Sequence, residues 1–309
     1  MISMADRVDT VTGKKKILFI VNPKSGTGNK RSIPVLLKKY LDADKFAYEI
    51  IQTNYAGEAA KISEENRDKF DIIVAIGGDG TINEVAGPLT NSNTVLGIIP
   101  CGSGNGLARH LKIPRNIKRA IKLLNKRCIA TIDTINLDER IFLNVAGVGF
   151  DAHIAQLFAN SKKRGFLSYA KLAMREIRKF ISVDYQLIID GQEKLEKAPF
   201  LISVANSTQY GNNAHIAPNA LIADGLMDVC VLRKVPAWYY PVLIYRMFTG
   251  TLTKSKYYQT WQGKEVQIKL LNDAHGKHMH IDGDPYAVSK NMKLKVNPLS
   301  LKVACQGSV

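Results

Sequence analysis

The sequence is poor in cysteine. Four cysteines occur in 309 residues, at positions 101, 128, 230 and 305, and they form no C-x-x-C pair and accompany no cluster of histidines. A zinc site and a disulfide framework are therefore not predicted, and a reducing, cytoplasmic compartment is expected.

Long hydrophobic runs are also missing. Residues 1–13 have no apolar segment of the secretory type, so they are expected to form a flexible tail. The longest nearly apolar stretch, Val235 to Phe248, is too short to cross a bilayer and contains Arg246. Any membrane contact is therefore expected to be peripheral, at the inner membrane surface.

Acidic residues are scarce beside basic ones. The chain has 43 lysines and arginines against 27 aspartates and glutamates, a formal net charge of +16. Such a chain is attracted to an anionic partner, which can be a nucleic acid, a phosphate-bearing ligand or an anionic membrane surface. No RNA-binding aromatic motif or helix-turn-helix pattern accompanies the charge, so nucleic acid is not predicted as a partner. A merely solvated basic surface is the alternative.

The first half of the chain alternates between two patterns. Short apolar runs at 17–21, 48–53, 71–76 and 95–99 predict strands, and helices are predicted around 31–41, around 57–67 and from near Ile82. This alternation is typical of a parallel sheet whose two faces are covered by helices. We predict an α/β domain over residues 14–138.

The second half of the chain has a different sequence pattern. Segments that read as strands are separated by turn signals, and helical patterns are sparse. The predicted strands are 141–147, 184–190, 199–206, 227–233, 264–271 and 292–296. We predict a mainly antiparallel β domain over residues 139–309, whose last residues could return to the first domain.

Three turn-rich loops follow predicted strands of the first half. They are the segments 22–28, 77–81 and 100–106, and all are rich in glycine or small polar residues. Ligands of parallel sheets bind beyond the carboxyl ends of the strands, where all three loops fall. Each loop alone could be an ordinary turn, but three at one edge predict a binding site.

The loop Gly77-Gly78-Asp79-Gly80-Thr81 indicates the ligand. Glycine lets backbone N–H groups approach phosphate oxygens without obstruction by Cβ. A carboxylate at the same point would repel a phosphate unless a divalent cation lies between them, so the loop predicts a nucleotide with Mg²⁺. A tight strand-to-helix turn is the alternative. Neither the P-loop nor the G-x-G-x-x-G pattern is present.

Four motifs together resemble the diacylglycerol kinase catalytic-domain family, which includes bacterial lipid kinases and the sphingosine and ceramide kinases. They are NPKSG at 22–26, GGDGTINE at 77–84, PCGSGNGLAR at 100–109 and FLNVAGVGFDA at 142–152. The resemblance runs in order from about residue 15 to 305. It implies an ATP- and Mg²⁺-dependent kinase that phosphorylates a lipid hydroxyl, on diacylglycerol or a sphingoid-type lipid.

The same resemblance implies a two-domain fold with ATP in the cleft between an α/β domain and a β-sandwich. GGDGT alone is shared with NAD kinases, so an NAD kinase-like enzyme is one alternative. A catalytically inactive homologue that binds nucleotide or lipid is another. The sequence leaves the formation of a homodimer open.

Carried over by position, the resemblance implies a set of nucleotide contacts. They are Asn22, Pro23, Lys24, Ser25, Gly26, Thr53, Gly77, Gly78, Asp79, Gly80, Thr81, Ile82, Asn83 and Ser103. Thr53 also ends the second predicted strand, where a helix N-cap is an equally simple explanation.

The motif His280-Ile281-Asp282-Gly283-Asp284-Pro285 looks like the late acidic motif of the family. Its last carboxylate acts there as the general base, so Asp284 is the implied base, with Asp79 as the second catalytic residue. The family more usually has glutamate at this position. Asp282 or Asp79 could share the role or bind metal, and a polar turn is the alternative.

A second acidic segment covers residues 221–228. In similar bacterial lipid kinases it holds a structural Mg²⁺, which implies ligands from Asp224 and the carbonyl groups of Leu221 and Leu226. An Asp-Gly hairpin turn is the simpler alternative. Gly106 stands where many bacterial members have aspartate and sphingosine kinases a small residue, which weakly favours a sphingoid-type substrate.

Two segments could contact a membrane. In 162–181, the apolar stripe Leu167, Ala170, Met174, Ile177 and Ile181 runs beside the basic stripe Arg164, Lys171, Arg175 and Arg178. We expect the apolar stripe to pack on the domain and the basic face to steer the protein to anionic lipid. The aromatic residues Trp238, Tyr239, Tyr240, Tyr245 and Phe248 could line a lipid cleft, although core packing is the more frequent reason for such a segment.

Overall fold

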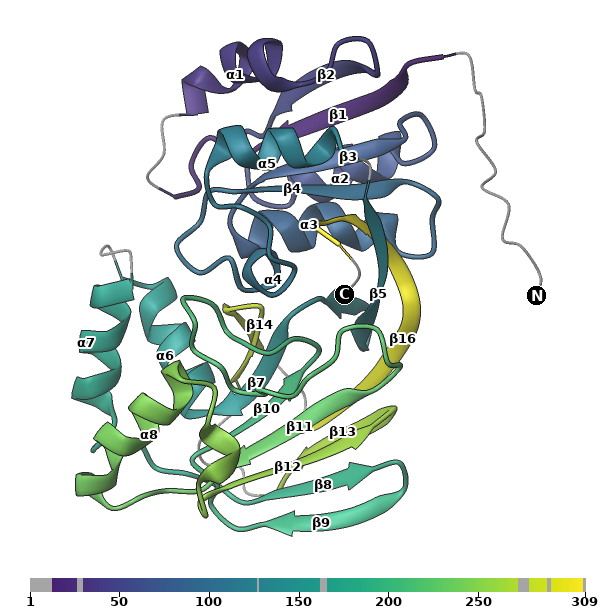
Figure 1. Ribbon diagram of the computed structural model, residues 1–309. Coiled ribbons are helices and arrows are strands. Elements are labelled where there is room, and N and C mark those ends of the chain that lie inside the picture. Colours follow the sequence, from purple (N-terminus) through teal and green to yellow (C-terminus); the bar gives the residue numbers. More distant parts are fainter. Residues whose placement is uncertain are drawn as a thin grey trace, which may run out of the picture.

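The computed structural model describes residues 13–26, 30–126, 128–161, 166–271, 278–287 and 290–307, and the side chain of Phe166 is not described. Most of the predicted tail and the predicted basic residue Arg164 lie outside these residues. Figure 1 shows two halves, with the first half above and the second below. No helix among the described residues is long and apolar enough to cross a membrane.

The first half contains a parallel sheet in the order β2-β1-β3-β4. Its elements are β1 (Lys15–Val21), η1 (Lys30–Ser32), α1 (Ile33–Tyr40), β2 (Phe46–Gln52), α2 (Glu58–Asn66), β3 (Ile72–Gly77), α3 (Asp79–Leu89), β4 (Val95–Pro100), α4 (Gly106–His110) and α5 (Ile117–Leu124). Every residue of β3 and β4 is buried. The predicted parallel sheet is therefore confirmed.

Helices cover both faces of this sheet. On one face, Ile33 of α1 and Ile121 of α5 pack against Phe19 and Val74. On the other face, Ile62 of α2 and Val85 of α3 belong to a second apolar core. Burial of the central strands on both sides explains their continuous apolar sequences.

Helix α3 begins earlier than the sequence predicted. It starts at Asp79 rather than near Ile82, with Gly78 as its extended N-cap residue, and the N–H of Ile82 donates to the carbonyl oxygen of Gly78 at 3.0 Å. The glycine-rich segment is thus the first turn of the helix. The partial positive charge of a helix N-terminus lies at the carboxyl edge of the sheet as a result.

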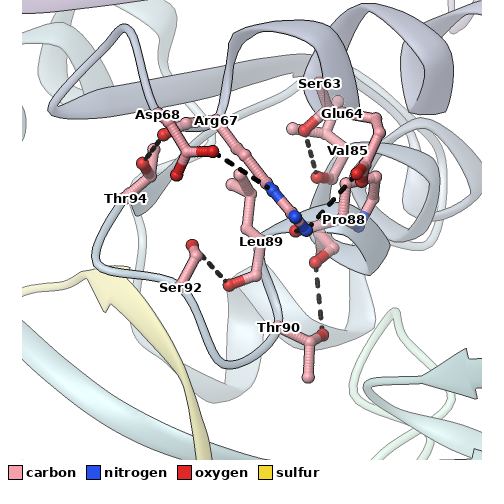
Figure 2. Close-up of polar contacts among 11 residues, drawn as sticks. Ser63, Glu64, Arg67, Asp68, Val85, Pro88, Leu89, Thr90, Ser92 and Thr94 are labelled. Atoms are coloured by element: carbon pink, nitrogen blue, oxygen red, sulfur yellow. Dashed lines mark hydrogen bonds and ion pairs between the residues drawn. The ribbon is translucent and has the colours of Figure 1, made fainter.

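The far end of α3 is fastened to α2 by polar contacts (Figure 2). Ser63 Oγ donates to the carbonyl oxygen of Val85 at 2.7 Å, and Arg67 Nη1 donates to that of Pro88 at 3.3 Å. Thr94 Oγ1, just before β4, donates to the carbonyl oxygens of Arg67 and Phe70. These bonds fix the direction of α3, and therefore where its N-terminus points.

The second half is a sandwich of two sheets. Its elements are β5 (Ile129–Leu137), β6 (Arg140–Phe142), β7 (Val145–Gly149), α6 (Phe150–Ala159), α7 (Phe166–Glu176), β8 (Tyr185–Ile189), β9 (Gln192–Glu196), β10 (Leu201–Ala205), β11 (Met227–Leu232), η2 (Ala237–Tyr239), α8 (Tyr240–Phe248), η3 (Leu252–Lys254), β12 (Tyr258–Gly263), β13 (Glu265–Leu270), β14 (His278–Ile281), β15 (Asp284–Ala287) and β16 (Asn291–Ala304). One sheet is antiparallel in the order β12-β11-β10-β7-β14-β15. An apolar core lies between it and the strands β5, β8, β13 and β16.

Strand β16 joins the halves. It pairs antiparallel with β5 and β13, and near its end Val303 pairs with Leu96 of β4 in parallel. The sequence predicted only residues 292–296 as a strand because Asn297 and Pro298 interrupt the pattern, where the register shifts. The larger sheet thus runs through both halves, and the domain boundary at residue 139 stays a prediction.

Most of the apolar stripe predicted to pack on the domain is exposed, so the prediction is wrong for Leu167, Met174 and Ile181, whereas Ile177 does pack on an apolar core. Leu167 is 75% exposed, Met174 73% and Ile181, just after the helix, 67%. The helix instead turns Tyr169, Leu172, Ala173 and Ile177 toward an apolar core. That inner face mixes aromatic and small residues with leucine, so hydrophobicity alone did not reveal which face is buried.

The aromatic residues of helix α8 and of the turn before it lie partly in the core and partly on the surface. Tyr239 and Tyr240 pack on the core that also receives α7. Trp238 and Tyr245 are 73% and 67% exposed. Both helices therefore pack on one core and keep large apolar side chains on their outer surfaces, on the same side of the antiparallel sheet (Figure 1).

Candidate active site

The three loops that follow β1, β3 and β4 touch one another. A Cβ added to Gly102 would lie 2.6 Å from Cα of Gly78, and a Cβ on Gly26 would overlap the carbonyl oxygen of Cys101. Asn22 Nδ2 donates to Thr81 Oγ1 at 3.0 Å, and Cys101 N donates to the carbonyl oxygen of Gly77 at 2.7 Å. Only glycine permits such close approach of the backbones.

The side chains predicted to contact a nucleotide differ in their exposure to solvent. Lys24 and Ser103 are exposed at the edge of the sheet. Thr53 is buried there, and its N–H donates to the carbonyl oxygen of Val21 at 2.9 Å. Ile82 faces the core, and its own N–H is already bonded to Gly78, so its side chain is not available to a ligand.

Around Asn22 the first loop is closed on itself. Asn22 Oδ1 accepts from the N–H of Lys24 at 3.0 Å, and the carbonyl oxygen of Asn22 accepts from Ser25 Oγ at 3.0 Å. Gly26 has a φ of +60°, which a side chain would strain. These bonds turn the segment from Asn22 to Gly26 across the end of the sheet.

Asp79 ties the second loop to the third. Its Oδ2 accepts from the N–H of Asn105 at 2.7 Å and its Oδ1 from the N–H of Gly106 at 2.8 Å, at the start of α4. Burial raises the pKa of Asp79 to about 6, the two N–H groups oppose that rise, and the charge of Asp282 adds to it. Asp79 therefore has a structural task besides any contact with a ligand.

Asp284 lies at the beginning of β15, in the second half of the chain. Its carboxylate points at the second loop, because a Cβ on Gly80 would lie 2.8 Å from Asp284 Oδ2. The residue is exposed to solvent. An exposed carboxylate and the first turn of α3 thus lie close together, although their sequence positions are far apart.

Asp282 holds the hairpin that carries Asp284. It accepts hydrogen bonds from the N–H groups of Leu143, Asn144 and Val145 at 3.0 to 3.1 Å, and from Asn83 Nδ2 at 2.7 Å. Burial raises the pKa of this carboxyl and its hydrogen bonds lower it. With four donors on two oxygens, Asp282 acts as a clamp between α3 and the second half.

The sequence missed this clamp. It predicted one strand over 141–147, whereas the structure has β6 and β7 with Leu143 and Asn144 between them. The N–H groups of those two residues turn to Asp282 rather than to a neighbouring strand. An irregularity of this kind leaves no mark in an apolar sequence.

Arg109 is a second residue that the sequence did not single out. Its Nε donates to the carbonyl oxygen of Gly104 at 3.0 Å, and its Nη atoms donate to the Oδ1 atoms of Asn212 and Asn213, each at 3.2 Å. It therefore ties the third loop to the segment after β10. Beside it, a Cβ on Gly106 would collide with Nδ2 of Asn144.

His110 makes the same connection from α4. Its Nδ1 accepts from the N–H of Thr208 at 3.3 Å and lies 3.1 Å from Thr208 Oγ1. Burial lowers the pKa of His110 to about 4, and the charges of His215 and Lys112 add to the effect. The imidazole is therefore neutral at physiological pH.

The lowered pKa predicts an acid-sensitive contact. As pH falls below about 6.5, the unfolded state binds a proton at His110 and the folded state does not, so stability is lost down to about pH 4. His110→Asn, whose Oδ1 can accept from the same N–H, should remove on the order of 3 kcal/mol of this loss. Thermal melting from pH 7 to 4 measures it, and an unchanged pH dependence would contradict the assignment.

The predicted metal ligands Leu221, Asp224 and Leu226 lie in another place, the turn between β10 and β11. Asp224 Oδ1 accepts from the N–H of Leu226 at 3.0 Å, which closes a local turn. In the described part of the chain no group of three His, Cys, Asp or Glu side chains could hold a metal ion. The proposed site needs only one carboxylate with two carbonyl groups, so it stays a prediction.

The arrangement defines a class of protein. Glycine-rich loops at the carboxyl edge of a parallel sheet, a helix N-terminus and a facing carboxylate are typical of phosphoryl-transfer enzymes. Residues 16–137 match the diacylglycerol kinase catalytic domain, and residues 144–305 match the YegS C-terminal NAD kinase beta sandwich-like domain. The chain belongs to the diacylglycerol kinase catalytic domain family and is a lipid kinase of the diacylglycerol kinase type.

Individual relatives agree. A diacylglycerol kinase of Bacillus subtilis is 32% identical over 229 residues, which is 71% of this chain and 74% of that protein. An uncharacterized protein of Synechocystis is 28% identical over 82% of this chain, which spans 62% of that longer protein. A crystal structure of a Bacillus anthracis diacylglycerol kinase has the same fold, with a TM-score of 0.71 at 23% identity over 94% of this chain and 97% of that one.

Proposed function

We propose that the protein transfers the γ-phosphate of ATP, with Mg²⁺, to a hydroxyl group of diacylglycerol or of a sphingoid-type lipid. The observation that carries the proposal is the position of Asp284, whose carboxylate lies against Gly80 in the loop that would hold the phosphates. An attacking lipid hydroxyl must lose a proton, and a carboxylate at this point can accept it.

The nucleotide would lie along the three touching loops. The segments from Asn22 to Gly26 and from Gly77 to Asn83, with Ser103, are proposed to receive the phosphates, while the N-terminus of α3 favours negative charge there. Lys24, exposed at the same edge, adds a positive charge.

The residues beside this loop fit a divalent cation. Mg²⁺ is usually held by one or two carboxylates together with substrate phosphates, and the second loop supplies the carboxylate of Asp79. Each oxygen of Asp79 accepts one backbone hydrogen bond and keeps lone-pair capacity for a cation. When bound, the cation neutralises charge on the phosphate oxygens as the phosphoryl group leaves.

A panel of acceptors tests the substrate. Diacylglycerol, sphingosine and ceramide in mixed micelles, and NAD in solution, would each be incubated with γ-labelled ATP and Mg²⁺, and the products separated by chromatography. We expect label in a lipid and dependence on Mg²⁺. Label only in NAD would indicate an NAD kinase-like enzyme, and no label in any acceptor would indicate an inactive homologue.

We further propose that α7 and α8 form the surface that contacts an anionic membrane. Leu167 and Met174 on α7 and Trp238 before α8 are among the most exposed large apolar residues of the described chain. Lys171 and Arg175 are exposed on α7 as well. Apolar side chains beside basic ones are what a peripheral contact with anionic lipid requires.

Vesicle binding tests this surface. The double variant Leu167→Ser with Met174→Ser should bind phosphatidylserine-containing vesicles roughly tenfold more weakly, because two apolar side chains no longer enter the interface. Leu195→Ser, on exposed β9 and 57% exposed, is the matched control and should bind normally. Equal binding of both variants in sedimentation assays would contradict the assignment of the surface.

A further inference from the structure

A further buried carboxylate lies away from the three loops. Asp151, in the first turn of α6, is 7% exposed. Its Oδ1 accepts from the N–H of Ala152 at 2.8 Å. Its Oδ2 accepts from Ser203 Oγ and Tyr210 Oη, both at 3.0 Å, and from His280 Nε2 at 3.1 Å. Because a carboxylate only accepts, the proton of His280 in this contact is on Nε2.

The fold leaves room for this network at one glycine. A Cβ on Gly147 would overlap Oδ2 of Asp151 and lie 3.1 Å from Nε2 of His280. Gly147 is paired with Ser203 on one side and with His280 on the other, so the three residues form one row across β10, β7 and β14. The carboxylate lies directly above this row.

The surroundings are apolar. Phe150 and Ile154 of α6, with Val145 and Leu201 of the sheet below, belong to the core between the helices and the antiparallel sheet. A charge in such a place is tolerated only while its hydrogen-bond donors stay in reach. The donors Ser203, Tyr210 and His280 therefore each fix the segment on which they lie relative to α6.

Two of these elements lead into the active site. His280 lies on β14, which runs into the turn at Asp282 and then to Asp284. Tyr210 precedes Gly211, where an added Cβ would lie 2.9 Å from the carbonyl carbon of Gly104 in the third loop. One carboxylate thus connects the hairpin that carries the proposed base with the segment behind a phosphate-binding loop.

We propose that Asp151 and His280 are positioning residues, which hold the β14–β15 hairpin so that the carboxylate of Asp284 lies at Gly80. The inference rests on the proposed role of Asp284 as the base. Asp282 fixes the turn of the hairpin from the side of α3, and the bond between His280 and Asp151 fixes its first strand from the side of α6. Two fixed points determine the direction in which Asp284 projects.

Two substitutions at His280 separate positioning from packing. His280→Gln retains an N–H at nearly the place of Nε2, whereas His280→Leu removes it and leaves Asp151 with one donor fewer. We expect His280→Leu to lower kcat roughly tenfold to a hundredfold, because a displacement of about 1 Å costs that much, with KM for ATP unchanged. His280→Gln should restore most of kcat.

Tyr258→Phe is the matched control. Tyr258 lies on β12 of the same sheet, packs in the same core, and donates to the carbonyl oxygen of Ile216 at 2.7 Å and to Cys230 Sγ at 3.0 Å. It makes a buried polar contact of the same kind with no connection to the hairpin. We expect a lower melting temperature for Tyr258→Phe and an unchanged kcat.

Amide hydrogen exchange gives a measurement that needs no lipid. In His280→Leu, a peptide covering residues 278–287 should exchange faster than in the wild type, while a peptide covering 77–83 should not change. In His280→Gln and Tyr258→Phe the first peptide should exchange as in the wild type. If His280→Leu does not fold, Asp151→Asn, which has the same shape and weaker acceptors, should show the same faster exchange.

Three results would overturn the proposal. They are equal kcat in His280→Leu and His280→Gln, a loss of kcat in Tyr258→Phe as large as in His280→Leu, or wild-type exchange over 278–287 in His280→Leu. If the wild-type protein phosphorylates no lipid, the proposed function fails, and the exchange data still decide whether Asp151 and His280 hold the hairpin.

Discussion

Asp284→Asn should lower kcat by about a hundredfold to ten-thousandfold, with ATP binding preserved. The amide has nearly the shape of the carboxylate, so the hairpin and its approach to Gly80 should persist. What it loses is the ability to accept the proton of the attacking hydroxyl. Steady-state kinetics at saturating lipid, with ATP affinity from calorimetry, separates the two effects.

Two further variants sharpen this result. Asp138→Asn changes another exposed aspartate at a hairpin turn, between β5 and β6, and should leave kcat unaltered. Asp284→Glu keeps a carboxylate that is one methylene longer and should retain substantial activity. A near-normal rate in Asp284→Asn would place the base elsewhere.

The parallel sheet and its three loops could be predicted because their signals are local. Strands β1, β3 and β4 are buried on both faces, so each appears as a continuous apolar run that ends in small residues. Topology then brings the ends of the runs to one edge without further information. The placement of Gly26, Gly78 and Gly102 followed from these elements alone.

The clamp at Asp282 and the network at Asp151 could not be predicted in this way. Asp282 binds groups 137 to 199 residues away along the chain, and Asp151 binds His280 across 129. Aspartate beside glycine in a turn has a sufficient local explanation, so nothing in the motif at 280–285 demanded distant partners. Long-range polar contacts of this kind can be identified only from a three-dimensional structure, or from pairs of positions that vary together among related sequences.

The prediction of which face of α7 is buried was wrong for another reason. Two stripes on this helix are apolar enough to be buried, and the structure buries the one with Tyr169 and Leu172 while leaving Leu167 and Met174 in solvent. Helical periodicity gives the spacing of a stripe and not its partner. The exposed stripe then requires an explanation of its own, which the proposed membrane contact supplies.

Asp79→Ala is the second substitution for which we expect a large loss of activity, and it should abolish measurable turnover. The substitution removes the acceptor for the N–H groups of Asn105 and Gly106, so the third loop loses its attachment to the second. It also removes a carboxylate that is proposed to hold Mg²⁺. The two losses act on the same point, because the loop that would move is the one beside the phosphates.

Asn116→Ala is the control for the structural part of the Asp79→Ala effect, because it removes backbone hydrogen bonding at a helix start without removing a proposed Mg²⁺ ligand. Asn116 caps α5 in the same half by accepting from the N–H of Arg119 at 3.2 Å, and it lies outside the three loops. Its replacement should cost about 1 kcal/mol of stability and leave kcat unchanged.

Asp79→Asn is the variant that distinguishes the two tasks of Asp79, because it changes the side chain less than Asp79→Ala does. An amide can accept from only one of the two N–H groups and turns its NH₂ toward the other, so the attachment of the loop is weakened rather than lost. If the main task of Asp79 is to hold the cation, raising the Mg²⁺ concentration should recover part of the activity of Asp79→Asn. If its main task is structural, Mg²⁺ should have no effect, and the melting temperature should fall as far as in Asn116→Ala or further. Activity measured against Mg²⁺ concentration, together with melting curves of the three variants, decides which of the two tasks of this carboxylate limits turnover.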